Sequence, residues 1–178
     1  MTDTDFTLSG LREAPAVTLP TYFPPTHGVR GQDGRVTYRG ETAALIEGYR
    51  NLLVDIIVPP RDTSERVPVV VFIHGGAFIM GASEEVWSPW FHIMQEKILA
   101  ARFAFASLTY RFSSEAPFPA QLVDAKAGLR YVRHFGADLG LDSDRVALWG
   151  GSAGAHLALL VALTPGRDLG EDRVRRGG

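Results

Sequence analysis

The stretch RVALWGGSAGAHLALLVAL, residues 145–163, decides the fold. The run 145–149 is predominantly apolar and of β type, whereas the Ala- and Leu-rich run 153–163 has helical character. Between them lies GGSAG, residues 150–154, which carries Ser152. This order predicts a strand, a tight turn flanked by glycines and then a helix, with Ser152 on the corner.

Ser152 has two interpretations. A G-x-S-x-G turn between a strand and a helix holds its serine on a strained corner with the hydroxyl exposed above the sheet, as a nucleophile requires. A small residue that closes a tight turn and caps the helix would have the same letters. The context favours the nucleophile, because an apolar strand comes directly before the turn and Ala153 and Gly154 let helix and strand approach closely.

Composition and charge exclude several classes of protein. The 178 residues are 46% hydrophobic and carry a net charge of −2, which is ordinary for one globular domain. No basic stripe indicates a nucleic-acid partner. The chain has no cysteine, which excludes disulfides and thiolate zinc sites. Because no set of His, Asp and Glu has metal-ligand spacing and no glycine loop has a phosphate-binding pattern, we expect neither a metal nor another cofactor.

The sequence also bears on location. Residues 1–10 include acidic side chains and lack the apolar centre of a signal peptide. No run reaches the roughly 18 apolar residues that a membrane span needs. We therefore expect a soluble, cytoplasmic protein that binds neither membrane nor nucleic acid.

The chain divides into three parts. Residues 1–34, rich in Pro, Gly, Thr and Asp, are predicted to be an irregular lead-in and a candidate cap segment. Residues 35–165 form the predicted domain, and the charged, glycine-rich residues 166–178 a disordered tail. Within the domain, strands are predicted at 51–58, 69–73, 103–110 and 145–149, and helices at 88–102, between Pro119 and Gly136, and at 153–163.

These elements predict an α/β fold. The run 69–73 is continuously apolar, which is typical of a strand buried on both faces of a parallel sheet. Strands that alternate with helices imply right-handed crossovers and a mostly parallel, doubly wound sheet with helices on both faces. The sheet is expected to be truncated after the helix 153–163. The predicted buried stripes are Trp90, Met94, Ile98 and Ala101 on one helix, and Leu122, Ala125, Leu129 and Val132 on the next.

A second motif, HGGAF at residues 74–78, follows the buried strand 69–73. Successive small residues let backbone N–H groups turn toward a common point, as the stabilisation of an oxyanion requires. A glycine loop that merely ends a strand, with His74 bonded to the backbone, would look the same. Pairing with the serine turn favours the oxyanion interpretation, and His74 itself is expected to be structural.

Together with YRFSSEAPFPAQLVDAKAGLRYVR (110–133) and LGLDSDRVALWGGSAGAHLA (139–158), these motifs resemble the α/β-hydrolase superfamily. Within it they are most similar to the hormone-sensitive-lipase-like and feruloyl-esterase-like carboxylesterases, with kynurenine formamidase nearby. The resemblance covers roughly 45–165 and implies a carboxylic ester hydrolase without a cofactor, with Ser152 as nucleophile. The implied oxyanion donors are the N–H groups of Ala153 and of Gly76 with Ala77, or of Gly75 with Gly76.

The chain departs from this family in three places. Ala77 stands where a third glycine is commoner, a tolerable change because the donor is backbone. Phe78 stands where formamidases tend to show Trp. The largest departure is that the family's triad runs in the order Ser, Asp or Glu, His, and nothing after Ser152 matches the acid or the base.

Other titratable residues are not expected to replace the missing pair. His156 lies four residues after Ser152, but an elbow serine points into the pocket and not along the helix, so His156 is expected to be a buried helix residue. Asp55, Asp124 and Asp142 are expected to be turn, cap or helix-surface residues. We therefore expect a hydrolase fragment that is nearly inactive alone.

Two classes of function remain open. The first is a serine hydrolase for a small ester whose Asp and His come from another chain or have been lost. The second is a non-catalytic remnant or binding module of the same fold, and among enzymes an arylformamidase-like amide hydrolase is a further alternative. The strand 145–149 normally lies mid-sheet, so its outer edge is expected to be open and to be covered by a second chain or by self-association.

Overall fold

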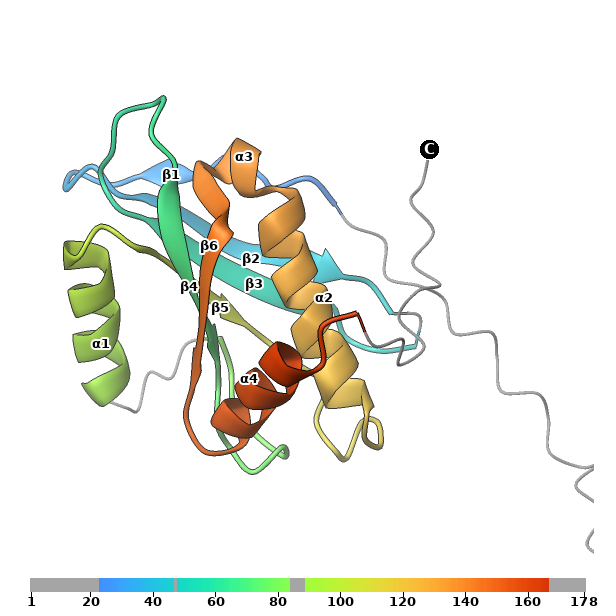
Figure 1. The fold of residues 1–178 in the computed structure, drawn as a ribbon. Coiled ribbons are helices and arrows are strands. Elements are labelled where there is room, and N and C mark those ends of the chain that lie inside the picture. The colour runs from blue at the N-terminus through green and yellow to red at the C-terminus, as the bar shows by residue number, and fades with distance from the viewer. Residues whose placement is uncertain (1–22, 47, 84–88, 167–178) are drawn as a thin grey trace, which may run out of the picture.

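The structure, a computed structural model, describes residues 23–46, 48–83 and 89–166. They form a six-stranded sheet with helices on both faces, which confirms the predicted α/β class (Figure 1). In chain order the elements are β1 (Val29–Arg30), β2 (Val36–Ala44), β3 (Leu52–Val58), β4 (Val67–Ile73), α1 (Pro89–Ala100), β5 (Ala104–Leu108), α2 (Ala120–His134), α3 (Gly136–Leu139), β6 (Leu141–Gly150) and α4 (Ala153–Leu163).

Every strand and helix predicted from the sequence is present. β6 begins earlier than predicted, at Leu141, where it pairs with Val67 of β4. β2 was not predicted, because its sequence VTYRGETAA is largely polar and it lies near an edge of the sheet, where half of it is accessible to solvent. The predicted lead-in contains β1, and its residues 1–22, like the tail residues 167–178, lie outside the described residues.

The sheet is mixed, with the order β1-β2-β3-β5-β4-β6. β4 pairs in parallel with both β5 and β6, whereas the pairs among β1, β2, β3 and β5 are antiparallel. The parallel part is smaller than predicted because the link 45–51 between β2 and β3 is too short for a crossover, which needs about a dozen residues or more. In the described part of the chain β6 is an edge strand whose neighbour is β4.

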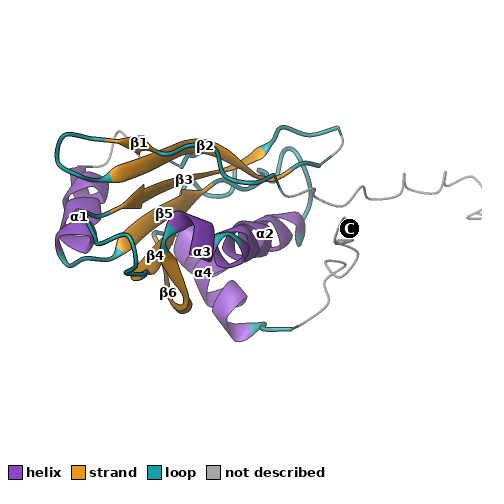
Figure 2. Cartoon of the chain, turned by 90° about the horizontal axis from the view of Figure 1, so that it is seen from above, coloured by secondary structure: helices purple, strands orange, loops and turns teal. Residues whose placement is uncertain are grey.

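The two faces of the sheet carry separate cores. Figure 2 shows α1 on one side of the sheet and α2, α3 and α4 on the other. The larger core joins the strands to α2 and α4 and includes the predicted α2 stripe. In the smaller core, Phe91 and Leu99 of α1 pack against Phe72 and Phe105 of the sheet. The predicted stripe of α1 is therefore wrong in phase: Trp90 is 74% exposed, and its neighbour Phe91 is buried instead.

Tyr131 on α2 is a stability determinant that can be tested directly. The side chain is fully buried, and among the described residues its hydroxyl has no hydrogen-bond partner. An unpaired buried polar group costs about 1–3 kcal/mol. We expect Tyr131→Phe, which keeps the ring, to raise the free energy of unfolding in urea by about 1 kcal/mol. A lower free energy of unfolding would mean that the hydroxyl is satisfied.

Candidate active site

The turn between β6 and α4 holds Ser152 in a strained conformation. Its φ is 50° and its ψ is −119°, a region that costs a non-glycine residue about 1–3 kcal/mol. The residue is exposed, and its side chain makes no capping hydrogen bond to α4. Ser152 therefore occupies the N-cap position of α4 but does not cap the helix through its side chain.

Glycines on either side of Ser152 let α4 pack directly on the strands. A Cβ atom added to Gly154 would lie 1.9 Å from the carbonyl oxygen of Ile73 in β4, and one added to Gly150 would lie 2.5 Å from the carbonyl carbon of Gly154. Neither backbone could hold a side chain without moving. The predicted close approach of helix and strand at Gly154 is confirmed.

The glycine loop after β4 lies beside the serine turn. β4 and β6 are parallel neighbours, with Ile73 opposite Gly150, so both strands end at the same edge of the sheet. A Cβ atom on Gly75 would lie 3.7 Å from the Cβ of Ser152 and 3.0 Å from the carbonyl oxygen of Gly151. The fold thus brings together the two motifs that the sequence singled out.

The loop itself bends through three consecutive residues with positive φ. Their φ values are 105° at Gly76, 53° at Ala77 and 63° at Phe78. The carbonyl oxygen of Gly76 accepts the N–H groups of Ile79 and Met80 at 3.0 and 3.1 Å. A Cβ on Gly76 would lie 2.0 Å from the carbonyl oxygen of Met80, so this position requires glycine, whereas the next accepts alanine.

The buried imidazole of His74 contacts the backbone of the glycine loop 74–78. It is fully buried, and its Nδ1 lies 2.7 Å from the carbonyl oxygen of Gly75. Because a carbonyl oxygen can only accept a hydrogen bond, Nδ1 is the imidazole nitrogen that carries the proton and donates it to this bond. The imidazole stacks on Tyr110 with 4.2 Å between ring centroids and 15° between planes. These contacts agree with the structural role expected of His74.

Three expectations about titratable residues are wrong, those for His156, Asp124 and Asp55. His156 is exposed, not buried, and the edge of its ring meets Phe78 at 6.0 Å between centroids, because its side of α4 faces the loop and not the core. Asp124 is buried, because α2 is covered by both the sheet and α4, and it accepts Nε and Nη2 of Arg111, each at 2.8 Å. Burial raises the pKa of Asp124, and the hydrogen bonds from Arg111 oppose that change.

The other two aspartates also have local partners. Asp55 lies within β3 and not in a turn, and it accepts the Gly40 N–H at 2.7 Å and the Ser83 hydroxyl at 2.6 Å. Asp142, near the start of β6, accepts the Asp144 N–H at 3.1 Å, as a turn residue does. Neither belongs to the region around the serine turn.

Over the described ranges, no hydrogen bond joins the Ser152 hydroxyl to a histidine or a carboxylate. The same residues contain no group of three or more His, Cys, Asp or Glu side chains that could hold a metal ion. None of their helices combines the length and the apolar character needed to cross a bilayer. In this part of the chain, therefore, the hydroxyl of the nucleophile candidate Ser152 is not hydrogen-bonded to a group that could act as its base.

Sequence reasoning missed the residues that hold the glycine loop from the other side. The Tyr110 hydroxyl donates to the carbonyl oxygen of His74 at 3.0 Å, and the Ser113 N–H donates to that of Phe78 at 2.7 Å. The available signal was position: Tyr110 is the last residue of the predicted strand 103–110, where a parallel neighbour's loop would be within reach.

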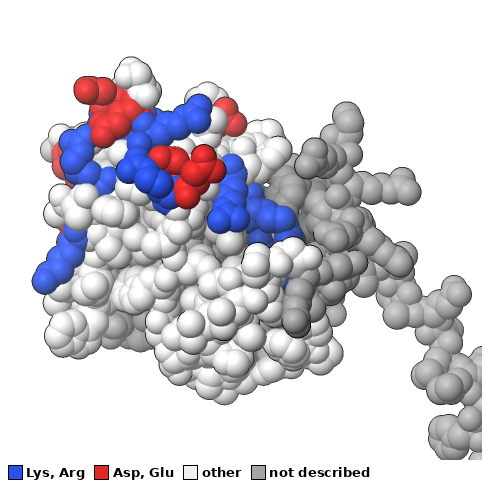
Figure 3. Space-filling model, viewed as in Figure 1, with Lys and Arg blue, Asp and Glu red and all other residues white. Residues whose placement is uncertain are grey.

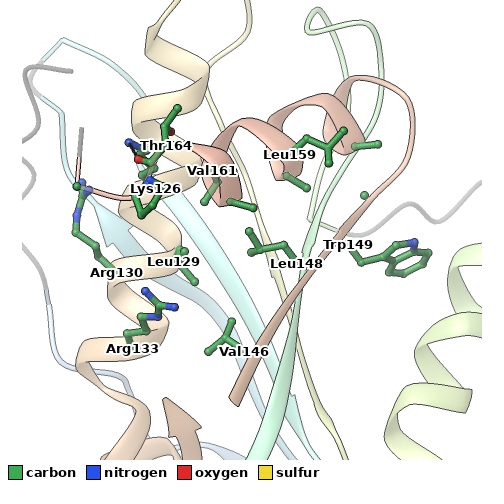
Figure 4. A pocket seen from close by; sticks show the side chains of 16 residues that line it. Lys126, Leu129, Arg130, Arg133, Val146, Leu148, Trp149, Leu159, Val161 and Thr164 are labelled. Atoms are coloured by element: carbon green, nitrogen blue, oxygen red, sulfur yellow. Dashed lines mark hydrogen bonds between the residues drawn. The ribbon is translucent and has the colours of Figure 1, made fainter. Parts of the chain in front are cut away.

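A hollow of the described surface lies elsewhere. It is a groove of about 830 Å³ along β6, between α2 and α4 (Figure 4). Neither Ser152 nor the loop 74–78 lines it. Its floor includes Val146 and Leu148 of β6, and Lys126, Arg130 and Arg133 of α2 stand along one side (Figure 4).

The mixed sheet, with a strained serine turn after β6 and a glycine loop after β4, has the α/β-hydrolase fold of the solved esterases to which this chain is similar. The chain belongs to the BD-FAE family, whose model matches residues 54–176.

Known proteins agree with this membership. Carboxylesterase NlhH of Mycobacterium tuberculosis is 32% identical over 124 residues, which are 70% of this chain and 37% of that protein. A bifunctional GH43-CE structure from Bacteroides eggerthii has a TM-score of 0.60 at 32% identity, covering 70% of this chain and 17% of its own. The butyrate-bound esterase Est2 of Thermogutta terrifontis has a TM-score of 0.57 at 26% identity, covering 67% and 42%.

The matched relatives are considerably longer than the region they share with this chain. The chain spans 37%, 27% and 31% of the lengths of the first three different curated relatives it matches, or about a third.

Proposed function

We propose that Ser152 is the nucleophile of a serine hydrolase that cleaves small carboxylic esters. The observation that carries this proposal is the strained, exposed and uncapped conformation of Ser152 beside Gly75. Strain of about 1–3 kcal/mol persists only where the surroundings enforce it, and it gathers at functional sites. A serine whose role was to cap α4 would direct its hydroxyl to an N–H group of the first turn, and Ser152 makes no such hydrogen bond.

Backbone N–H groups would bind the oxyanion. Ala153 is the first residue of α4, so its N–H is one of those that a helix leaves unpaired, and the helix dipole favours negative charge there. Gly76 with Ala77, or Gly75 with Gly76, would supply the other donors. The proximity of Gly75 to Ser152 supports this assignment.

In the proposed reaction, Ser152 Oγ attacks the ester carbonyl carbon while its proton passes to a histidine. The tetrahedral oxyanion collapses, and the alcohol leaves with that proton, so that the acyl group remains on Ser152. Water then attacks the acyl carbonyl while the same histidine takes its proton, and the histidine passes that proton to Ser152 Oγ as the carboxylic acid leaves.

The base and the acid of this reaction are proposed to come from outside these 178 residues. Two observations support this: no histidine or carboxylate bonds to Ser152 in the described part of the chain, and the chain spans about a third of its curated relatives. We therefore propose a hydrolase portion whose Asp and His are supplied by a further segment or a second chain.

The surroundings of the serine turn favour a neutral substrate. In Figure 3 the charged side chains gather at the end of this face away from the β6–α4 turn, and the end that carries the turn is neutral. Est2, similar to this chain, has been solved with butyrate bound. A short-chain ester fits both observations. An arylformamidase-like activity is less favoured because Phe78 replaces the Trp typical of formamidases.

The alternative is a non-catalytic remnant or binding module, and it is favoured because no histidine or carboxylate of the described residues is hydrogen-bonded to the Ser152 hydroxyl. The two are separated by incubating the chain with an alkyl fluorophosphonate at pH 9, where hydroxide can act as base, and mapping the adduct by peptide mass. Labelling concentrated on Ser152, with slow release of p-nitrophenol from p-nitrophenyl acetate, supports the hydrolase. Labelling spread evenly over the serines, or none, supports the remnant.

We also propose that the open edge of β6 is covered by a second chain or by self-association. β6 has its one described neighbour, β4, on one side, and the groove that β6 lines has the apolar side chains of Val146 and Leu148 on its floor. An exposed strand edge of this kind is a site for pairing with another chain. The chain alone is therefore expected to sediment as oligomers or aggregates.

A charge on the edge tests this. Ala147 in β6 is exposed, and a lysine on an edge strand opposes pairing. We expect Ala147→Lys to shift the sedimenting species toward monomer by at least about tenfold in dissociation constant, an effect of roughly 1.4 kcal/mol. Ala100→Lys on α1 makes the same change in charge at another exposed site and should leave association unchanged. A monomeric, cooperatively folding parent chain would refute the proposal.

A further inference from the structure

Tyr110 touches the glycine loop at the place where the proposed oxyanion donors begin. It follows β5, is fully buried and stacks on His74. Its hydroxyl lies 3.0 Å from the carbonyl oxygen of His74 and 3.3 Å from that of Gly75. One phenol thus holds the carbonyl groups of two successive peptides.

Peptide geometry turns these contacts into a constraint on the next N–H groups. In a planar trans peptide, the carbonyl of one residue and the N–H of the following residue point in opposite directions. Holding the His74 carbonyl toward Tyr110 therefore turns the Gly75 N–H away from Tyr110. Holding the Gly75 carbonyl does the same for the Gly76 N–H.

The following peptide is held by the loop itself. The Gly76 carbonyl accepts Ile79 N–H and Met80 N–H, which fixes the direction of the Ala77 N–H by the same geometry. The orientation of the donor at 75 thus depends on a contact from outside the loop, and that of the donor at 77 is set within it. The donor at 76 is held in both ways, because the Gly75 carbonyl oxygen lies 2.7 Å from His74 Nδ1 as well as 3.3 Å from the Tyr110 hydroxyl.

Tyr110 is itself anchored. Its carbonyl oxygen accepts a hydrogen bond from Arg50 Nη2 at 2.6 Å. The next residue, Arg111, donates its backbone N–H and two guanidinium N–H groups to Asp124, each at 2.8 Å. A bidentate, buried pair of this kind resists displacement. The phenol is therefore attached to α2 and to the end of β5, and cannot follow the loop if the loop moves.

We infer that Tyr110 is a positioning residue of the oxyanion site, whose hydroxyl fixes the orientation of the Gly75 N–H group and, together with His74 Nδ1, that of the Gly76 N–H group. This inference rests on the proposed function. It gives Tyr110 a role in the chemistry that acts through the backbone of the glycine loop.

The test compares Tyr110→Phe with Tyr131→Phe. Each change removes one hydroxyl from a fully buried tyrosine, but the Tyr131 hydroxyl is on α2 and has no partner among the described residues. Fluorophosphonate labelling of Ser152 at pH 9 is followed over a range of probe concentrations. We expect Tyr110→Phe to lower the maximal labelling rate about tenfold and to leave the half-saturating concentration unchanged, because only the charge formed in the transition state loses its donors.

A spectroscopic readout separates positioning from folding. In ¹H–¹⁵N spectra, Tyr110→Phe should shift the amide signals of Gly75 and Gly76 and leave those of α2 in place, whereas Tyr131→Phe should leave the loop signals in place. If the Tyr110→Phe variant does not fold, the same measurements are made on the double variant Tyr110→Phe/Tyr131→Phe, because Tyr131→Phe is expected to raise the free energy of unfolding. Failure of that double variant to fold would make Tyr110 a residue of the fold and overturn the inference.

The outcomes distinguish the two proposals. A parent chain that is not labelled at Ser152 overturns the proposed function, and the inference with it. A parent chain that is labelled, with Tyr110→Phe as fast as Tyr131→Phe, overturns the inference alone and leaves the nucleophile assignment intact.

Discussion

The Ser152→Ala variant is expected to lose all fluorophosphonate labelling at this turn, because the substitution removes the one atom that forms the adduct. With the missing base supplied by a second segment or chain, ester turnover should fall on the order of 10⁶-fold, the loss seen when a catalytic serine is removed. The measurement is the mass of the adduct peptide, together with p-nitrophenol release.

The variant should remain folded. Ser152 is exposed and makes no capping hydrogen bond, so its urea unfolding should lie within about 0.5 kcal/mol of the parent chain. Ser64→Ala, at an exposed serine in the turn between β3 and β4, is the matched control and should label normally. Retained ester turnover in Ser152→Ala would count against the nucleophile assignment.

Gly154→Ala is expected to destabilise the chain by about 3 kcal/mol or more. The added Cβ would lie 1.9 Å from the carbonyl oxygen of Ile73 and 2.5 Å from that of His74, and backbone atoms of a central strand cannot move aside. Helix propensity favours alanine over glycine by about 1 kcal/mol, so the steric cost has to exceed that gain. Urea unfolding measures the sum.

Gly151→Ala is the natural comparison. A Cβ there meets nothing within 4 Å, so this variant should unfold with nearly the parent free energy. Because Gly154 also sets the distance between α4 and the glycine loop, surviving Gly154→Ala protein should label more slowly at Ser152. Equal stability of the two glycine variants would show that α4 is not packed against β4 as described.

The pattern of apolar residues predicted much of the fold. Strands β3, β4 and β5 and helices α2 and α4 were predicted close to their observed bounds, because burial on both sides leaves a continuous or strongly periodic apolar run. β2 was not predicted, because a strand near the edge of a sheet has polar residues facing solvent and lacks a clear apolar pattern. In α1 the adjacent residues Trp90 and Phe91 both fit a stripe, and only packing on Phe72 and Phe105 selects the second.

The candidate site divides in the same way. Local sequence predicted the serine on its turn and a glycine loop able to present N–H groups, since both depend on residues within five positions of one another. The supporting residues Tyr110, Arg111 and Asp124 were not assigned from the sequence. Asp124 in particular was expected on the surface, because α2 becomes covered on both sides only once α4 has packed beside it.

Sequence alone therefore determined the chemical groups and the local backbone conformations: a serine where φ must be positive, and glycines where a Cβ has no room. Only the tertiary structure decided that these groups meet, because their contact depends on β4 lying between β5 and β6. Strand order is a property of the whole sheet, set by the sum of many weak packing contacts among distant residues, and no short stretch of sequence encodes it.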